Sequence, residues 1–232
     1  MYTAVYNGRD CRDFGLKIVK RPDIPVPEKR ITEITVPGRS GRLHIDEGTY
    51  EPIELIVQFN FCQKPNGWAE VMRKIRKWLL AEENQKLIFS DDPFCYYKVS
   101  HVRLEDNAER KMKRLGYFEA VFSCDPYTYG TNGDMEIGIP CTLYNDGEVA
   151  MPLYKIKGEG MCTIRVNNIS VTANVGQELM IDVDRMMAYR GNEMQNTAVS
   201  GDIGELKLVP GQNAIQITEG FEAVVVPRWR YL

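Results

Sequence analysis

Six cysteines and two histidines are the side chains of this sequence best suited to hold a metal ion or to act as nucleophiles. The histidines are His44 and His101, and no two cysteines form a C-x-x-C pair. A structural zinc site needs four ligands, which usually come in closely spaced pairs, so no metal is expected. We instead expect most of the cysteines to be buried, reduced thiols, because a free thiol packs as a small hydrophobe. The cysteines are Cys11, Cys62, Cys95, Cys124, Cys141 and Cys162, of which Cys62, Cys95 and Cys124 lie in apolar, strand-like segments.

Sequence motifs of catalysis are missing. There is no G-x-S-x-G elbow, no phosphate-binding glycine loop, no H-E-x-x-H and no dinucleotide fingerprint. A glycosidase needs only two carboxylates at a suitable separation, and Asp182 with Asp184, or Asp91 with Asp92, are candidate pairs. Acidic residues are also common at strand ends and in turns. We therefore expect a protein that is not an enzyme and has no cofactor, with glycan hydrolysis as an alternative.

Aromatic residues in the second half of the chain leave another alternative open. A β-sandwich that binds sugar presents aromatic rings beside amide or carboxylate groups, and a carbohydrate-binding module that contacts a cell envelope would use such rings. The same rings could equally belong to the core. The candidates are Tyr144, Tyr154, Tyr189, Phe221, Trp229 and Tyr231.

Composition indicates a soluble globular protein. The chain has 232 residues with a formal charge of −3, and 44% of its residues are hydrophobic. It contains no apolar stretch long enough to span a bilayer, and the polar, proline-containing first thirty residues do not resemble a signal peptide. Cytosolic synthesis without membrane association is therefore expected.

The charge distribution suggests two domains, which the length also allows. Residues 1–130 contain 21 Lys and Arg against 19 Asp and Glu, whereas residues 131–232 contain 8 against 13. Neither part has the concentrated positive charge that sequence-independent DNA binding needs.

The first part predicts an α+β domain in which one helix packs on a β-sheet. The helix is expected over residues 67–83 with Asn66 as its N-cap. Its apolar residues recur with helical periodicity, and they are Trp68, Val71, Met72, Ile75, Trp78 and Leu79. The opposite face is basic, with Arg73, Lys74, Arg76 and Lys77, and is expected to be solvated or to contact an acidic partner. Strands are expected over residues 1–6, 14–19, 30–36, 53–61, 86–89, 95–104 and 115–124.

Two segments of the first part are rich in proline and glycine. Three prolines within residues 21–27 exclude a helix and a central strand, and favour an extended arm. Residues 37–41 read PGRSG and end the preceding strand with turn residues.

The second part predicts a β-sandwich or jelly roll, because short strands recur at regular spacing with turns between them. Strands are expected at Leu143 and over residues 154–157, 162–166, 169–173, 178–183, 205–208, 214–218 and 223–228.

A series of modest motifs along the chain resembles the siphophage distal tail protein family. In the first part these are VPGRSGRL at 36–43, GTY at 48–50 and FEAVFSCDPY at 118–127. In the second part they are NDG at 145–147, IKG at 156–158, IRVN at 164–167, LMID at 179–182 and LVPGQNAI at 208–215. No single motif is decisive. Their order across essentially the whole chain carries the resemblance.

The resemblance implies a mainly β fold with a ring-forming domain at 1–130 and a galectin-like β-sandwich at 131–232. It also implies a structural virion protein of a long, non-contractile phage or prophage tail. Six copies would form a ring at the tail tip that joins the tail tube protein to the tip or baseplate hub protein and lets DNA pass without specific binding. A receptor-binding protein is a further implied partner, and assembly would take place in the cytoplasm of the bacterial host.

A ring requires head-to-tail contacts between copies, and rigid extended segments could reach a neighbouring copy. The candidate interface residues are Pro25, Pro27, Pro37, Gly38, Arg39 and Gly41. For the second group, the alternative is a simple hairpin turn that happens to contain Arg39. The second domain, of about a hundred residues, leaves no room for a large inserted carbohydrate-binding module, so another tail protein is expected to recognise the host.

Overall fold

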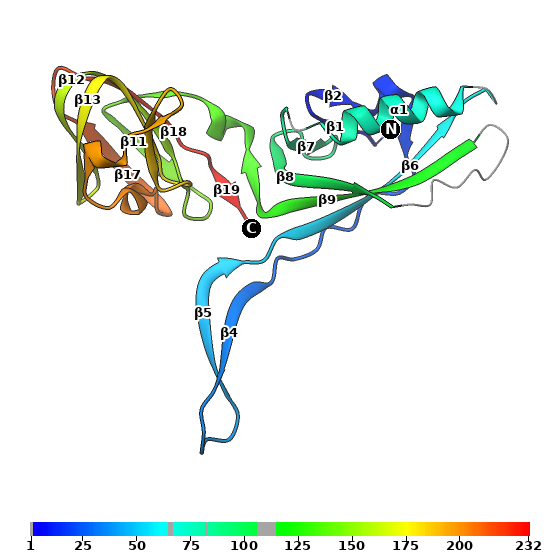
Figure 1. The fold of residues 1–232 in the computed structure, drawn as a ribbon, viewed down its shortest axis with the longest axis horizontal. Coiled ribbons are helices and arrows are strands. Elements are labelled where there is room, and N and C mark those ends of the chain that lie inside the picture. Colours follow the sequence, from blue (N-terminus) through cyan, green and yellow to red (C-terminus); the bar gives the residue numbers. More distant parts are fainter. Residues whose placement is uncertain (1, 65–66, 82, 106–114) are drawn as a thin grey trace. The chain divides into compact units, whose positions relative to one another are not determined.

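A computed structural model describes residues 2–64, 67–81, 83–105 and 115–232 of the chain. They form two compact units, Met1–Thr128 and Tyr129–Leu232. Both units consist mainly of strands, and one α-helix is present among these residues (Figure 1). The mainly β fold expected from the sequence is confirmed. Along the chain, the boundary between the two units lies two residues before the one that the sequence suggested.

The first unit is built on one antiparallel sheet with the strand order β2-β1-β7-β8-β9-β6-β3. In β6 every second side chain is buried, from Ile53 to Phe61, because alternate residues of a strand face opposite sides of the sheet. Cys62 falls on the other face and is exposed, so its expected burial is wrong. The strands are β1 (Ala4–Tyr6), β2 (Arg9–Asp10), β3 (Leu16–Ile18), β6 (Ile53–Cys62), β7 (Lys86–Phe89), β8 (Cys95–Leu104) and β9 (Leu115–Gly130).

Helix α1 (Trp68–Leu79) covers the buried face of this sheet with Met72, Ile75, Trp78 and Leu79. It ends four residues before the predicted end, because the apolar stripe stops at Leu79 and the next side chain, Leu80, is 55% exposed. The four basic side chains on its other face are exposed, as expected for a solvated surface. Gly67 occupies the N-cap position, and Asn66 lies outside the described residues.

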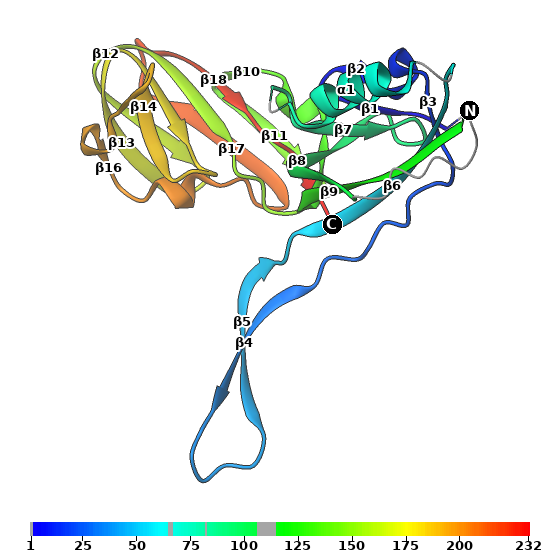
Figure 2. The same ribbon diagram turned by 45° about the vertical axis from the view of Figure 1, so that its right-hand side comes forward.

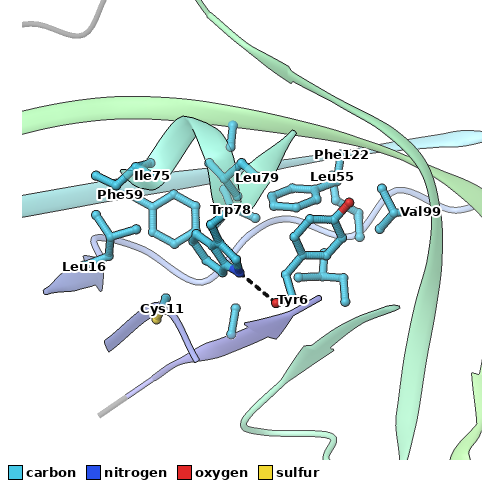
Figure 3. Close-up of a cluster of buried hydrophobic side chains, with 14 of the residues drawn as sticks. Tyr6, Cys11, Leu16, Leu55, Phe59, Ile75, Trp78, Leu79, Val99 and Phe122 are labelled. Carbon is cyan, nitrogen blue, oxygen red and sulfur yellow. Dashed lines mark hydrogen bonds between the residues drawn. The ribbon is translucent and has the colours of Figure 1, made fainter. Parts of the chain in front are cut away.

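Trp78 is the centre of the core of the first unit (Figure 3). Its indole ring stacks on Phe14 at 4.5 Å between centroids, and its Nε1–H donates a 2.8 Å hydrogen bond to the carbonyl oxygen of Tyr6. The ring of Tyr6 in turn meets Phe122 edge-on at 5.2 Å. This hydrogen bond ties the helix to β1 across a sequence separation of about seventy residues.

The start of the chain is less regular than predicted. The expected strand at residues 14–19 is shortened to β3, and a 3₁₀ turn (Cys11–Phe14) precedes it. Residues 19–28, which contain the three prolines, form no regular element and connect β3 to β4.

Strands β4 (Lys29–Thr35) and β5 (Arg42–Tyr50) form a separate two-stranded ribbon (Figure 1). Every residue of β4, and every residue of β5 except Tyr50, is exposed, so neither face of the ribbon packs on a core formed by the described residues. The sequence predicted β4 but missed β5. The alternation of Leu43 and Ile45 with His44 and Asp46 was the signal that indicated a strand there.

The second unit is a sandwich organised by one long hairpin (Figure 2). Strands β12 (Leu153–Val166) and β13 (Ile169–Asp182) pair over fourteen residues each, so four predicted strands are in fact two. The first part of β12 pairs with β18 and its last part with β17. The chain turns from one layer to the other near Gly158 and Gly160, whose φ angles of 146° and 100° suit glycine.

The buried side chains of both layers form one core. The predicted strand at residues 205–208 is wrong, since Ile203–Leu206 is a 3₁₀ turn capped by Asp202, whose side chain accepts a hydrogen bond from the Gly204 amide. The other strands are β10 (Ile137–Ile139), β11 (Cys141–Asn145), β14 (Met187–Arg190), β15 (Glu193–Met194), β16 (Val199–Ser200), β17 (Gly211–Ile217), β18 (Glu222–Val226) and β19 (Arg230–Tyr231).

Candidate interaction surface

The two faces of the β4–β5 ribbon differ, because three aliphatic side chains gather on one face and most of the charged side chains lie on the other, beside Ile31. In the antiparallel register Ile34 lies opposite Leu43, and Thr32 opposite Ile45. Residues directly opposite each other point to the same side of the ribbon. We call Ile34, Leu43 and Ile45 the apolar ribbon face. Their exposed fractions are 41%, 39% and 44%.

Such a face is unusual for a segment that has no core to cover. An isolated two-stranded hairpin is at best marginally stable in water, and clustered exposed aliphatic side chains mark interaction surfaces. The apolar ribbon face is therefore the strongest candidate interaction surface on the first unit.

The charged face holds the two strands in register. Glu33 contacts Arg42 and lies 3.6 Å from Nδ1 of His44, while Lys29 donates a 2.8 Å hydrogen bond to Asp46. The Lys29 hydrogen bond, with a second from the Gly48 amide, lowers the pKa of Asp46. Exposed ion pairs of this kind contribute little each, so they set the register of the ribbon more than its stability.

The loop between the two strands gathers four of the six predicted interface residues at the tip of the ribbon. Pro37, Gly38, Arg39 and Gly41 are all exposed there, and the Arg39 amide donates a hydrogen bond to the carbonyl oxygen of Val36. The loop is thus a hairpin turn.

The other two predicted interface residues lie apart from the tip. Pro25 and Pro27 belong to the connector at residues 19–28, where Pro25 is exposed and Pro27 half-buried. The interface role of all six residues stays a prediction.

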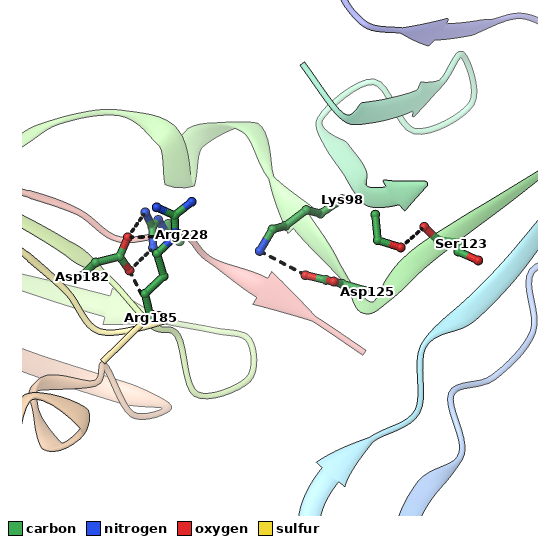
Figure 4. A network of polar contacts seen from close by, with 7 residues as sticks. Lys98, Ser123, Asp125, Asp182, Arg185 and Arg228 are labelled. Carbon is green, nitrogen blue, oxygen red and sulfur yellow. Dashed lines mark hydrogen bonds and ion pairs between the residues drawn. The ribbon is translucent and has the colours of Figure 1, made fainter. Parts of the chain in front are cut away.

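The candidate catalytic carboxylate Asp182 is engaged in a buried ion pair (Figure 4). Arg228 donates hydrogen bonds of 2.8 and 3.1 Å to its two oxygens, and the Arg185 amide donates another of 3.3 Å. The Asp182 side chain is only 2% exposed. Burial raises the pKa of Asp182, but the hydrogen bonds and charge of Arg228 outweigh burial and lower the pKa overall. This carboxylate fixes Arg228 instead of facing a substrate.

Replacing Asp182 with alanine is expected to lower the free energy of unfolding by about 2–4 kcal/mol, because Arg228 loses its partner in a largely buried position. The folded-state pKa of Asp182 lies below the ordinary value of 3.8. The difference between wild type and variant should therefore stay constant from pH 7 to about pH 4 and shrink at lower pH, as Asp182 is protonated. Urea unfolding at several pH values measures this difference. The exposed Glu159→Ala is the control, and an equal loss for both variants would contradict the prediction.

No group of three or more potential metal ligands is present in the part of the chain that the structure describes. The six cysteines are free thiols, and Cys11, Cys124 and Cys162 are buried. Burial raises the pKa of Cys124 to about 12 and that of Cys162 to about 11. These thiols therefore stay protonated at neutral pH and are poor nucleophiles.

The aromatic residues considered for sugar binding do not form an exposed platform. Of the six, only Tyr144 is exposed, at 71%, whereas Tyr154 and Trp229 belong to the core. Tyr189, Phe221 and Tyr231 are half-buried.

No helix among the described residues combines the length and the apolar character that crossing a membrane requires.

Comparison with known proteins finds similarity among solved structures. Neither a protein-family model nor a curated protein matches the sequence. Among solved structures, the fold matches the crystal structure of SPP1 Dit, described as a paradigm of the hub adsorption apparatus in phages that infect Gram-positive bacteria. The match covers 100% of both chains with a TM-score of 0.66 at 15% sequence identity. The two chains thus have the same fold along their whole length.

Proposed function

We propose that this chain, which has the fold of SPP1 Dit, is a structural hub protein of a long, non-contractile phage or prophage tail. The observation that carries the proposal is the full-length fold match, which agrees with the motif order in the sequence. The protein has no chemistry of its own in this role, and its function resides in its interfaces.

We further propose that six copies form a ring between the tail tube and the tip or baseplate. A closed ring needs a head-to-tail interface in which two different surfaces of the same chain meet. The β4–β5 ribbon supports this arrangement, because it offers an exposed apolar face that the described residues of its own chain leave uncovered.

The ring is proposed to let DNA pass without binding it. A conduit should not hold the DNA, and residues 1–130 contain nearly equal numbers of basic and acidic residues, 21 against 19. Sequence-independent DNA affinity would need clustered, uncompensated cations. The partners are the tail tube protein, a tip or baseplate hub protein and a receptor-binding protein, in a virion tail assembled in the host cytoplasm.

Light scattering of the purified protein, with negative-stain images of the same sample, tests the ring. We expect a mass of six times the 26.6 kDa of one chain and ring-shaped particles with a central opening. A protein that stays monomeric up to high concentration, alone and with a tail tube protein, would contradict the proposal. A glycan-binding screen would then be the next measurement.

A further inference from the structure

The first unit carries a groove on the outer face of its sheet. Residues 20–25 of the connector run beside β6 and β9 and leave a groove of about 370 Å³, to which Glu54, Ile56, Gln58 and Glu119 also contribute. These β6 residues are the even-numbered ones, which face away from the core because the odd-numbered ones are buried under α1. We call this site the connector groove.

The connector groove is apolar where an aliphatic partner could pack. Ile24 on its connector side is 54% exposed, and Ile56 on β6 is 47% exposed. The prolines on either side of Ile24 restrict the backbone of the connector, so its wall is held in an extended conformation.

Charge in the connector groove is compensated except at one residue. Asp23 pairs with Lys20 at 2.8 Å and Glu54 with Arg103 at 3.7 Å. Glu119 accepts hydrogen bonds from the Gln58 side-chain amide, at 2.9 Å, and from the Tyr117 hydroxyl, at 2.5 Å. No cation of the described residues forms an ion pair with Glu119.

The tip of the ribbon carries a cation without an ion pair among the described residues, while Glu47 on β5 contacts only the Thr32 hydroxyl there. Lys29, Arg30 and Arg42 each pair with a carboxylate of the ribbon or its base. Arg39 at the tip forms no ion pair with any described residue and is exposed. Within the described ranges, Arg39 at the ribbon tip and Glu119 in the connector groove therefore each lack an ion-pair partner.

We propose that the connector groove of one copy receives the apolar ribbon face of a second copy, with Arg39 of the second copy beside Glu119 of the first. The inference rests on the proposed ring and names the acceptor surface that the ring requires. Ile34, Leu43 and Ile45 supply aliphatic side chains for Ile24 and Ile56, and the two unpaired charges become partners. The ribbon does not fill the groove of its own copy, because its side chains are exposed in the single chain.

Disulfide trapping tests the contact in the full-length chain. Arg39→Cys and Glu119→Cys are combined in a background with Cys62→Ser, which removes the exposed native thiol, and the protein is oxidised with copper phenanthroline. The two single variants are controls, and so is the pair Arg39→Cys with Arg73→Cys, which moves the second thiol to the exposed face of α1. Products are separated on non-reducing gels, and light scattering of the same samples before oxidation reports their assembly.

The expected result is a ladder of linked chains for the double variant, and only linked dimers for a mixture of the two single variants. The mixture stops at dimers because each copy then carries only half of a head-to-tail contact. Assembled protein with no more linkage than the Arg73→Cys control would overturn the groove assignment and leave the ring intact. Protein that is neither assembled nor linked would overturn both.

A charge exchange covers the possibility that the cysteines themselves weaken the contact. Arg39→Glu is expected to weaken assembly at least tenfold, and the double variant Arg39→Glu with Glu119→Arg should recover most of it, because each interface then regains an opposite pair. Loss of assembly in the single variant without recovery in the double variant would count against the contact between these two residues.

Discussion

Replacing Ile34 and Leu43 together with aspartate is expected to convert the ring into monomers while both units stay folded. The two residues face each other across the centre of the apolar ribbon face. Burying one such side chain contributes about 1.5–3 kcal/mol, so losing two per interface weakens association by about a hundredfold or more. Two opposed aspartates also repel each other. Because both positions are exposed in the single chain, no core is disturbed.

Light scattering of the variant measures the change in mass, and circular dichroism checks the fold. The matched control is the pair Thr35→Asp and His44→Asp on the charged face of the same two strands, where both residues are also exposed. The control is expected to keep the ring. If both variants dissociate to the same extent, the apolar ribbon face is not the determinant of assembly.

Trp78→Ala is expected to lower the free energy of unfolding of the first unit by about 3–5 kcal/mol, the range for removing a large aromatic side chain from a core. Trp78 is 4% exposed and packs against Phe14 and Phe59. Its loss also removes the hydrogen bond to the Tyr6 carbonyl, which is left without that donor in the core. A loss of this size is a large fraction of the stability of an ordinary single domain, which is about 5–15 kcal/mol.

Urea unfolding followed by circular dichroism measures this loss. Leu80→Ala, at the exposed end of the same helix, is the control and should change the stability little. A loss below about 1 kcal/mol for Trp78→Ala would mean that the helix is not anchored through this residue.

A loss of stability in the first unit should also reduce assembly, because the proposed groove is built on its sheet. Ring formation by Trp78→Ala is therefore expected to fail at lower temperature than ring formation by the wild type. Light scattering during heating separates this indirect effect from that of Ile34→Asp with Leu43→Asp, which should fail to assemble at every temperature.

Local periodicity in the sequence was sufficient to predict α1, β6 and the mainly β character of both units. The apolar stripe from Trp68 to Leu79 and the alternation from Ile53 to Phe61 both report which side of an element is buried, and that side is set by neighbours a few residues away. The order of the modest motifs along the chain indicated the fold that the structure shares with SPP1 Dit.

Only the tertiary structure decided how far the strands extend and which distant residues contact their side chains. Strands β12 and β13 run through residues that interrupt the apolar pattern, because fourteen cross-strand pairs hold them together. Asp182 is a buried partner of Arg228, which lies 46 residues away. The connector groove likewise depends on residues from three separate segments, around residues 20–25, 54–58 and 119. Such features depend on pairing between distant residues, and a pattern of neighbouring residues contains no information about it.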